Sequence, residues 1–563
     1  MSYIFDMVKY ISKFVFLLLF IPLATQAAEV GFQPAVASAH PLATQAGIEI
    51  LEQGGNAFDA AVAVSAALAV VEPYGSGLGG GGFWLLHIAK DRVDVMLDGR
   101  ERAPLAANRD MYLYDKGNVI PGASINGPLA AGIPGTVAAL EQLSKKYGSL
   151  PFSTTLAPAI AYARDGFVVD EHYRRMAGHR LTALQRSDAA DIFLSDDLVP
   201  EVGELIKQSD LAASLELITK QGAKAFYTGE LAEQMVASVK EHGGIWSMED
   251  LAEYKVVERF PEVIVYKGMR LVAASLPSSG GMALAEILNM LSFYEIERMK
   301  PVDRIHLLVE VMRRAYRDRA EHMGDPDFVD VPAGLLTSSV YTNKLIQSID
   351  RDKATPSAEL KAVAEPTGNG ADTTHFSIID AEGNRVSATM SINYPFGSGF
   401  VAEGTGILLN DEMDDFSAKP GVPNVYGLVG AEANAIEPGK RMLSSMSPSF
   451  LETHDRIAIL GTPGGSRIIT MVLLAMLDFY QGGDAESMVN LGRFHHQYLP
   501  DKISFEPGVF DQAVVKELSK MGHQLEAMSN RYGNMQVVVA NKKTGKVEAA
   551  SDSRGLGQAR VLH

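Results

Sequence analysis

Thr373 lies between a polar segment and a predicted strand, a position in which a threonine could act as a nucleophile. A polar stretch, residues 365–371, leads to Asp372, and the residues after Thr373 have the composition of a strand. If the chain were cut between Asp372 and Thr373, the Thr373 hydroxyl would be a nucleophile and its own α-amine would be the base. An α-amine has a pKa of about 7.7–8.0, so part of it is free base near neutral pH. Threonine pairs are also common in strands, and these two residues alone favour that simpler interpretation.

The elements around Thr373 would hold it at the start of a β-hairpin. A short strand after Thr373 is followed by a turn at residues 381–384 and by a second strand from Arg385 to Ile392. The glycine-rich segment 461–466 lies between a strand and an apolar helix. The further elements expected in this half are a strand at 457–460, a helix from about 467 to 480, and strands at 536–541 and 547–550.

The first half of the chain combines helices with a glycine-rich turn. Residues 41–53 have helical periodicity, and Asn56 can cap a second, very apolar helix that reaches about Val71 and should be buried. The turn at 75–82 precedes two strands, expected at 83–88 and 92–97. Residues 105–345 are expected to be mainly helical, and residues 350–372 are polar and linker-like. Strands in both halves with helices outside them indicate a layered α/β protein.

Composition excludes several classes of function. The chain has 563 residues, is 47% hydrophobic and carries a formal charge of −18, so it can build a large core but offers no basic surface for nucleic acid. It contains no cysteine, which rules out disulfides, thiolate nucleophiles and cysteine-bound metals.

Residues 1–28 have the pattern of a secretory signal. Lys9 and Lys13 precede an apolar run at 14–24, and small residues follow at Ala27 and Ala28. The run is short for a membrane span, which needs about 20 apolar residues, although an uncleaved N-terminal anchor is the alternative. The pattern predicts export to the periplasm or the medium, with no stable membrane insertion once the signal is removed.

Two further motifs suggest other sites and carry less weight. Gly75, Gly77 and Gly80 match a dinucleotide-binding fingerprint, but a helix precedes them and a strand follows, which reverses the order that a phosphate site needs. A tight turn where chains approach closely is the simpler interpretation. His495 and His496 are adjacent, and adjacent residues of a strand point to opposite faces, so they rarely share one metal ion.

The chain as a whole resembles the gamma-glutamyltranspeptidase family of N-terminal-nucleophile hydrolases. Each motif that carries the resemblance is weak alone, but their occurrence together in this order is specific. They are ASAHP at 37–41, QGGNAFDAA at 53–61, GGGG at 79–82, GIPGT at 132–136, TTH at 373–375, MDDF at 413–416, SSMSP at 444–448, GGSR at 464–467 and RFHHQ at 493–497.

The resemblance implies an αββα sandwich and a precursor that cleaves itself between Asp372 and Thr373. The products would be a large subunit, 29–372, and a small subunit, 373–563, which together form one folded unit. Thr373 would then attack the γ-glutamyl amide of glutathione and related donors. Water, or the amine of an amino acid or peptide, would resolve the γ-glutamyl enzyme. No metal or cofactor is implied.

The resemblance also assigns roles in the site. Arg100 would grip the α-carboxylate of the donor, and Glu412 and Asp415 would bind its α-ammonium. Backbone N–H groups of Gly464 and Gly465 would form an oxyanion hole. Hydroxyl and amide contacts come from the remaining matches: Ser391 beside the nucleophile, where many members have threonine, and Asn393, Ser444 and Ser445 on the glutamyl group. Residues 420–427 resemble a lid over the pocket.

Three alternatives remain open at this stage. A related acylase of the same fold would act on glutaryl side chains of β-lactams and would not need Glu412 and Asp415. A non-catalytic, uncleaved binding protein would not need Thr373. A nucleotide-binding oxidoreductase rests only on the glycine motif at 75–80.

Overall fold

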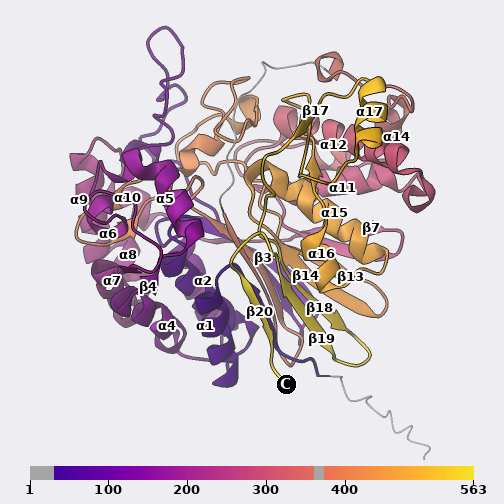
Figure 1. Cartoon of the computed structure of the whole chain (residues 1–563). Coiled ribbons are helices and arrows are strands. Elements are labelled where there is room, and N and C mark those ends of the chain that lie inside the picture. The colour runs from indigo at the N-terminus through magenta and orange to yellow at the C-terminus, as the bar shows by residue number, and fades with distance from the viewer. Residues whose placement is uncertain (1–30, 361–372) are drawn as a thin grey trace, which may run out of the picture.

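Two antiparallel sheets lie face to face between two layers of helices (Figure 1). The structure is a computed structural model that describes residues 31–360 and 373–563. The predicted signal segment, residues 1–28, and Asp372 lie outside these residues. The layered αββα arrangement confirms the fold predicted from the sequence.

The first sheet has seven strands in the order β20-β1-β9-β10-β2-β3-β6, and the second has six in the order β19-β18-β14-β13-β8-β7. The first comprises β20 (Gln558–Val561), β1 (Ala35–Ser38), β9 (Thr374–Ile379), β10 (Arg385–Ser391), β2 (Gly81–Ile88), β3 (Val93–Gly99) and β6 (Val257–Arg259). The second comprises β19 (Val547–Ser551), β18 (Gln536–Asn541), β14 (Arg456–Gly461), β13 (Ser449–Glu452), β8 (Met269–Ala273) and β7 (Glu262–Tyr266).

Polar side chains join the two sheets where β9 and β10 face β14 and β18. The Ser387 hydroxyl donates to the carbonyl of Leu460 over 2.9 Å, and the Ser377 hydroxyl donates to the carbonyl of Gln536 over 3.1 Å. His375 lies in the same interface, and burial lowers its pKa to about 3, so its imidazole is neutral. Gly461 is required opposite it, because a Cβ there would lie 2.3 Å from the ring.

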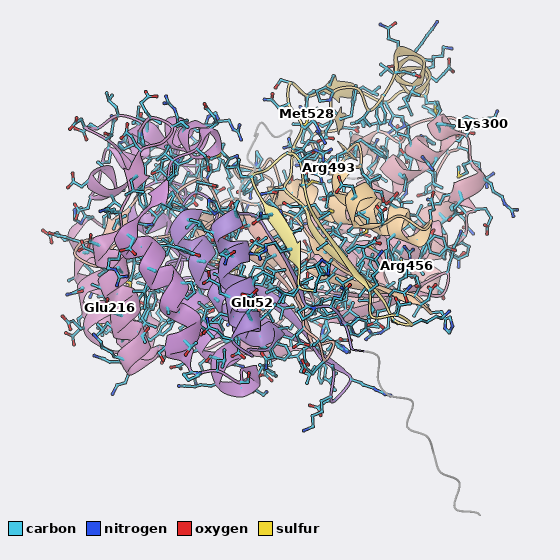
Figure 2. The ribbon with its side chains drawn as sticks, turned by 60° about the horizontal axis from the view of Figure 1, so that its bottom comes forward. Glu52, Glu216, Lys300, Arg456, Arg493 and Met528 are labelled. Carbon is cyan, nitrogen blue, oxygen red and sulfur yellow. The ribbon has the colours of Figure 1, made fainter. Side chains whose placement is uncertain are left out.

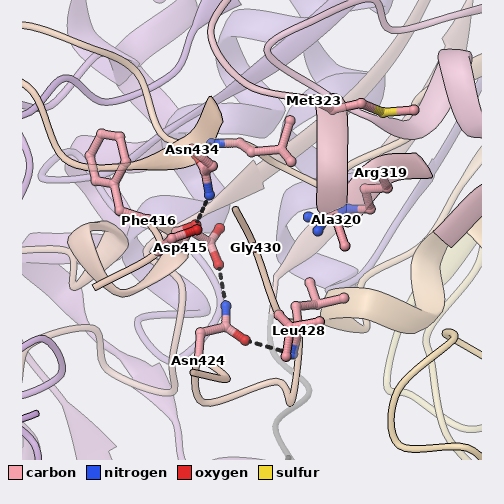
Figure 3. Close-up of a pocket in the computed structure, with 12 residues that line it drawn as sticks. Arg319, Ala320, Met323, Asp415, Phe416, Asn424, Leu428, Gly430 and Asn434 are labelled. Atoms are coloured by element: carbon pink, nitrogen blue, oxygen red, sulfur yellow. Dashed lines mark hydrogen bonds between the residues drawn. The ribbon is translucent and has the colours of Figure 1, made fainter. Parts of the chain in front are cut away.

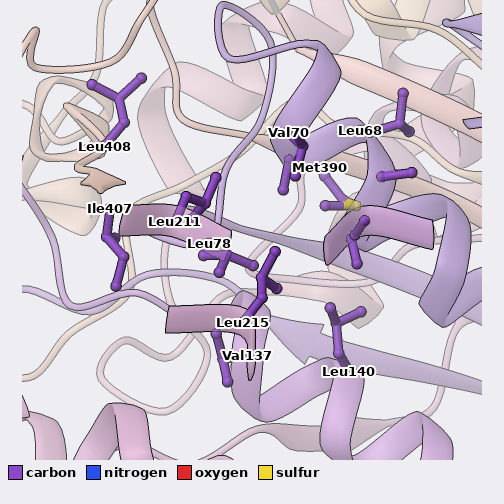
Figure 4. Packing of buried hydrophobic residues seen from close by; sticks show 14 of the residues in the cluster. Leu68, Val70, Leu78, Val137, Leu140, Leu211, Leu215, Met390, Ile407 and Leu408 are labelled. Atoms are coloured by element: carbon purple, nitrogen blue, oxygen red, sulfur yellow. The ribbon is translucent and has the colours of Figure 1, made fainter. Parts of the chain in front are cut away.

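The helix α2 (Ala57–Val71) is the centre of the core on the outer side of the first sheet. Asn56 and Asp59 form a capping box at its start, and every residue of the helix is buried. It packs on β9 and β10 on one side and on α1 (Pro41–Glu52), α3 (Thr136–Tyr147) and α4 (Phe152–Asp165) on the others. Figure 4 shows Leu68 and Val70 of α2 among the apolar side chains of this layer.

The opposite helical layer covers the second sheet. Its main helices are α11 (Gly280–Leu291), α12 (Pro301–His322), α15 (Ile468–Tyr480) and α16 (Ala485–Asn490). Figure 2 shows the two helical layers apart, with Glu52 and Glu216 on one and Lys300 at the start of α12 on the other. Among residues 31–360 and 373–563, no helix is both long enough and apolar enough to cross a membrane.

The remaining elements are short or peripheral. They are α5 (Glu171–Leu184), α6 (Ala189–Phe193), α7 (Ser209–Gln221), α8 (Lys224–Tyr227), α9 (Glu230–Glu241), α10 (Met248–Ala252), α13 (Ala333–Leu336), α14 (Ser339–Gln347), α17 (Gln512–Lys520), β4 (Phe167–Val168), β5 (Leu205–Ile206), β11 (Val401–Ala402), β12 (Ile407–Leu408), β15 (Phe494–His495), β16 (Ile503–Phe505) and β17 (Leu525–Ala527).

The middle of the chain is mainly helical, as predicted, but the sequence analysis missed the strands β6, β7 and β8. The hairpin between β7 and β8 turns at Lys267 and Gly268, which both have positive φ. A lysine in the first of these positions is an unusual turn residue, and the expected asparagine or aspartate signal is missing. Ile264 and Tyr266 of β7 are buried, but Val263 and Val265 on its other face are exposed and also apolar, so the strand lacks the apolar–polar alternation that would mark it.

The glycine-rich turn brings the chain close to the end of β10 and to β12. A Cβ at Gly79 would lie 2.2 Å from the carbonyl oxygen of Leu408, and one at Gly80 would lie 2.3 Å from that of Ser391. The turn follows α2 and leads into β2, which confirms the expectation of a close approach between chains.

Gly80→Ala is therefore expected to destabilise the fold by about 1–3 kcal/mol, because the added methyl overlaps the backbone of Ser391. Denaturant unfolding measures the change. Gly178→Ala is the matched control: Gly178 is exposed within α5 and a Cβ there meets nothing within 4 Å, so this variant should be as stable as the wild type or slightly more so. Equal stability of the two variants would contradict the packing described for the turn.

Candidate active site

One cavity gathers nearly all of the residues that the sequence singled out. It lies at the end of β9 and β10, under the segment that follows residue 417. The predicted residues that line it are Arg100, Thr373, Ser391, Asn393, Glu412, Asp415, Ser444, Ser445 and Gly465. Gly464 immediately precedes Gly465, and Asp372 is outside the described residues. The chain brings these residues together from both sides of Thr373.

The Thr373 hydroxyl stands beside the hydroxyl of Ser391. Their oxygens are 3.4 Å apart, and the Ser391 oxygen also accepts a hydrogen bond from the backbone N–H of Asn393 over 2.8 Å. Ser391 keeps a second lone pair and its own proton, so either hydroxyl of this pair can be the donor. The pairing of Thr374 with Met390 places Ser391 next to Thr373 at the sheet end.

Glu72 supports the residue after the candidate nucleophile and was missed by the sequence analysis. The Thr374 hydroxyl donates to Glu72 Oε2 over 2.6 Å, and Tyr74 donates to Oε1 over 3.4 Å. Burial raises the pKa of Glu72 to about 7. The side chain extends from the end of α2, so it connects that helix to the start of β9. The only sequence signal was a carboxylate at the end of a wholly apolar helix.

A buried charge cluster occupies the other end of the cavity. The Arg100 guanidinium lies 2.8 Å from Glu412 Oε2 and 2.5 Å from Asp415 Oδ2. Glu101, also missed by the sequence analysis, lies 3.5 Å from the same guanidinium. Burial raises the pKa of Glu412 to about 7, against the lowering effect of Arg100, and burial with the charge of Glu412 raises that of Glu101 well above its usual value.

Two serines and an asparagine face the space between these ends. The Ser444 oxygen accepts from the N–H of Met446 over 3.1 Å, and the Ser445 oxygen accepts from Arg319 Nη2 over 3.2 Å. Asn393 has a φ of 72°, and its side-chain amide donates to the carbonyl of Asp411 over 3.0 Å. This left-handed backbone aims the residue back into the cavity.

Gly464 and Gly465 begin the helical segment beside the nucleophile. Their φ angles are 140° and 55°, and they lead into a 3₁₀ turn, Gly465–Arg467, and then α15. The first N–H groups of a helix have no partner within it and carry the positive end of its dipole, which suits a developing oxyanion. A Cβ at Gly465 would lie 2.5 Å from the Tyr426 ring, so the lid also needs glycine there.

The segment predicted as a lid, 420–427, packs against the cavity. Asn424 Nδ2 donates to Asp415 Oδ1 over 3.1 Å, and the Tyr426 hydroxyl donates to the carbonyl of Asn393 over 2.5 Å. Figure 3 shows Asn424 joined to both Asp415 and Leu428, with Asn434 bonded to the backbone of Asp415. The lid therefore holds the residues that line the cavity as well as covering it.

Histidines outside this site form hydrogen-bonded networks. His495 pairs with Thr470 over 2.8 Å, whereas His496 pairs with Asp501 over 3.2 Å, so the two point into different surroundings as expected. The group His306, Glu310 and His523 has ligand spacing, with the chosen atoms within 4.8 Å of one another. Arg313 and Arg314 both contact Glu310, and two guanidiniums at a carboxylate oppose the binding of a cation.

Comparison with known proteins links the chain to one family. The family model described as Gamma-glutamyltranspeptidase matches residues 43–562. The glutathione hydrolase proenzyme of Escherichia coli K12 is 41% identical over 531 residues, which is 93% of this chain and 91% of that protein. The protein of the same name from Pseudomonas aeruginosa is 41% identical over 543 residues, or 94% of each chain.

Solved structures agree with this result. The cephalosporin acylase of Bacillus halodurans superposes with a TM-score of 0.82 at 27% identity and covers 96% of this chain and 99% of its own. A chain of the Helicobacter pylori gamma-glutamyltranspeptidase superposes with a TM-score of 0.56 at 42% identity, over 59% of this chain and 95% of its own.

The pKa of Glu72 generates a pH-dependent prediction. Folding favours the neutral carboxyl, so its contribution to stability is complete below pH of about 4.5 and is lost as the pH rises through about 7. Glutamine stays neutral and can still accept from Thr374. The free energy of unfolding of Glu72→Gln relative to the wild type should therefore rise with pH, by on the order of 3 kcal/mol between pH 4.5 and 7.5.

Denaturant unfolding at several pH values measures this difference. The same change at the exposed Glu171, on the surface of α5, is the control for general effects of charge. A difference at Glu72 that stays constant across this pH range would contradict its burial as a neutral acid.

Proposed function

The chain belongs to the gamma-glutamyltranspeptidase family, and we propose that it is a γ-glutamyl transferase and hydrolase that activates itself by cleavage before Thr373. The observation that carries the proposal is one cavity with the Thr373 hydroxyl at one end and the buried cluster of Arg100, Glu412 and Asp415 at the other. The first end supplies a nucleophile, and the second suits a zwitterionic head group.

Self-cleavage would proceed by an intramolecular attack. The Thr373 oxygen adds to the carbonyl carbon of Asp372, and the C–N bond breaks as the acyl group moves from nitrogen to oxygen. This shift frees the α-amine of Thr373, and water then hydrolyses the ester, which leaves a carboxylate on Asp372 and restores the Thr373 hydroxyl. The contact between Thr373 and Ser391 supports this step, because a hydroxyl neighbour can hold the attacking oxygen in place.

The sheet order supports two chains that remain one folded unit. In the first sheet, β9 and β10 of the proposed small subunit, 373–563, lie between β1 and β2 of the proposed large subunit, 29–372. In the second sheet, β13 of the small subunit pairs with β8 of the large one. A cut before Thr373 would leave these ladders intact.

Turnover would use the same hydroxyl with its new α-amine. The amine takes the Thr373 proton as the oxygen attacks the γ-carbonyl of the donor, and it returns a proton to the leaving amine. The N–H groups of Gly464 and Gly465 would stabilise the oxyanion of the tetrahedral intermediate. Water, or the amine of an amino acid or peptide, then resolves the γ-glutamyl ester.

The charge cluster supports a γ-glutamyl head group as the donor. Asp415 and Glu412 would bind the α-ammonium, and Arg100, Ser444 and Ser445 would bind the α-carboxylate, with Asn393 beside the glutamyl chain. Glutathione is the donor suggested by relatives named glutathione hydrolase proenzyme. The signal-like segment, 1–28, supports action in the periplasm or outside the cell.

The likeness to a cephalosporin acylase raises a second candidate, an acylase for glutaryl groups. A glutaryl group has no α-ammonium, so an acylase would gain nothing from two buried carboxyl groups beside Arg100. The placement of Glu412 and Asp415 within 2.8 Å of that guanidinium favours the γ-glutamyl donor.

Turnover of a γ-glutamyl anilide tests the proposal. The wild type should release the aniline, and Asp415→Asn should lower kcat/KM by at least tenfold, because the ammonium loses a charged partner worth roughly 1.5–3 kcal/mol. Asp110→Asn, which changes an exposed aspartate, is the control and should behave as wild type. A wild type that does not act on the anilide would contradict the function, and an unaffected Asp415→Asn would contradict the donor assignment alone.

A further inference from the structure

A second buried arginine stands behind the cavity. Arg319, on α12, donates from Nε to the Ser279 hydroxyl over 2.9 Å and from Nη2 to the Ser445 hydroxyl over 3.2 Å. It is 5% exposed, and no carboxylate oxygen within the described parts of the chain lies within 4.0 Å of it. Burial lowers the pKa of Arg319 although the charge of Asp415 acts in the opposite direction, and a buried cation whose side chain bonds only hydroxyl groups is unusual enough to require a purpose.

The direction of these hydrogen bonds determines what the serines can do. A guanidinium can only donate, so Ser279 and Ser445 must both accept from Arg319. The Ser279 hydroxyl donates its own hydrogen bond to the carbonyl of Ser444 over 2.6 Å. Ser445 has no such acceptor in the described residues, and it lines the cavity that contains Thr373. Arg319 thus leaves the Ser445 hydroxyl with a proton to donate into the cavity.

The charges around the cavity indicate which group of a donor would accept the hydrogen bond from Ser445. Arg100 already faces the carboxyl groups of Glu412, Asp415 and Glu101. A donor that brings a further carboxylate needs positive charge that these groups have not already paired. Arg319 can supply this charge, because it and Asp415 line the same space behind the pocket (Figure 3).

Arg319 contacts the cavity indirectly. It is not among the described residues that line the cavity with Thr373, whereas Ser445, to which its Nη2 donates, does line it. The route from Arg319 to the donor runs through the Ser445 hydroxyl and through the electrostatic field of its charge.

We propose that Arg319 is a positioning residue that sets the specificity for an α-carboxylate on the donor. It fixes the Ser445 hydroxyl as a hydrogen-bond donor toward the cavity. It also supplies positive charge in addition to that of Arg100, which already faces three carboxyl groups. The inference rests on the proposed function, since it names how the γ-glutamyl site recognises one part of its substrate.

Two donors that differ only in the α-carboxylate test the inference. They are the γ-glutamyl anilide and the 4-aminobutyryl anilide, which keeps the amine but lacks the carboxylate. Arg319→Met should raise KM for the γ-glutamyl donor at least tenfold and leave kcat within about threefold of the wild-type value. This pattern is expected when a variant loses binding energy that the substrate and the transition state share equally. It should leave KM for the second donor nearly unchanged. Arg304→Met, at the start of the same helix, is the matched control.

Inhibition constants provide the same comparison without turnover. L-glutamate and 4-aminobutyrate are both measured as competitive inhibitors of the wild type and of Arg319→Met. The variant should bind L-glutamate about tenfold more weakly than the wild type does. It should bind 4-aminobutyrate less than twofold more weakly. In a Ser445→Ala background, the added effect of Arg319→Met on L-glutamate should be clearly smaller, because the two residues act through one hydroxyl. Arg319→Lys keeps the charge and should recover part of the affinity for L-glutamate. If Arg319→Met does not fold, Arg319→Lys takes its place in the comparison of the two ligands.

The outcomes separate this inference from the function on which it rests. Wild-type turnover of the γ-glutamyl anilide establishes the function first. If the wild type is active and Arg319→Met weakens both ligands by the same factor, Arg319 has only a structural role and the inference is wrong. Additive effects of Arg319→Met and Ser445→Ala would also contradict it.

Discussion

The antiparallel pairing of β9 with β1 and of β10 with β2 is the constraint on which the rest of this structure depends. It inserts the hairpin that begins at Thr374 into the middle of a sheet whose other strands, apart from the edge strand β20, come from the first half of the chain. Thr373 is thereby held at the end of a central strand, between Ser391 on one side and the turn after Glu72 on the other. A flexible segment could not keep a hydroxyl in this position, whereas a buried ladder fixes it.

The same ladder makes a cut before Thr373 compatible with a stable fold. The sheets, the serine bonds between them and the apolar layers around α2 and α15 all cross between the two sides of the cut. The buried charge cluster lowers the stability of this framework, because buried ions lose hydration that their partners only partly replace. A site that holds Arg100 among carboxyl groups, with Arg319 bonded to serine hydroxyls behind it, therefore makes sense as a binding device, and its desolvation is offset by the large core.

Much of this arrangement could be predicted from the sequence, because the signals are local. The proline that begins α1, the cap of α2 at Asn56, the apolar helix after Gly465 and the hairpin after Thr373 each lie within a few residues of their cause. The residues of the cavity came from ordered motifs, and the structure gathers them in one place. Their individual roles remain predictions, as do the boundaries of the two subunits.

The rest depends on contacts between residues far apart in the chain. Glu72 meets Thr374 across 302 positions, and Arg319 meets Ser445 across 126, so no local pattern marks either residue. The hairpin of β7 and β8 was missed because Lys267 is not a typical turn residue. In each case the controlling interaction is tertiary, and sequence periodicity does not report it.

The N-terminal sequence of the purified protein tests the central claim most directly. The wild type and Thr373→Ala would be compared on a denaturing gel, with sequencing of the smaller band. The account predicts two chains from the wild type, the smaller beginning at Thr373, and a single chain from Thr373→Ala. A wild type that stays in one piece, or a smaller chain that begins at another residue, would contradict it.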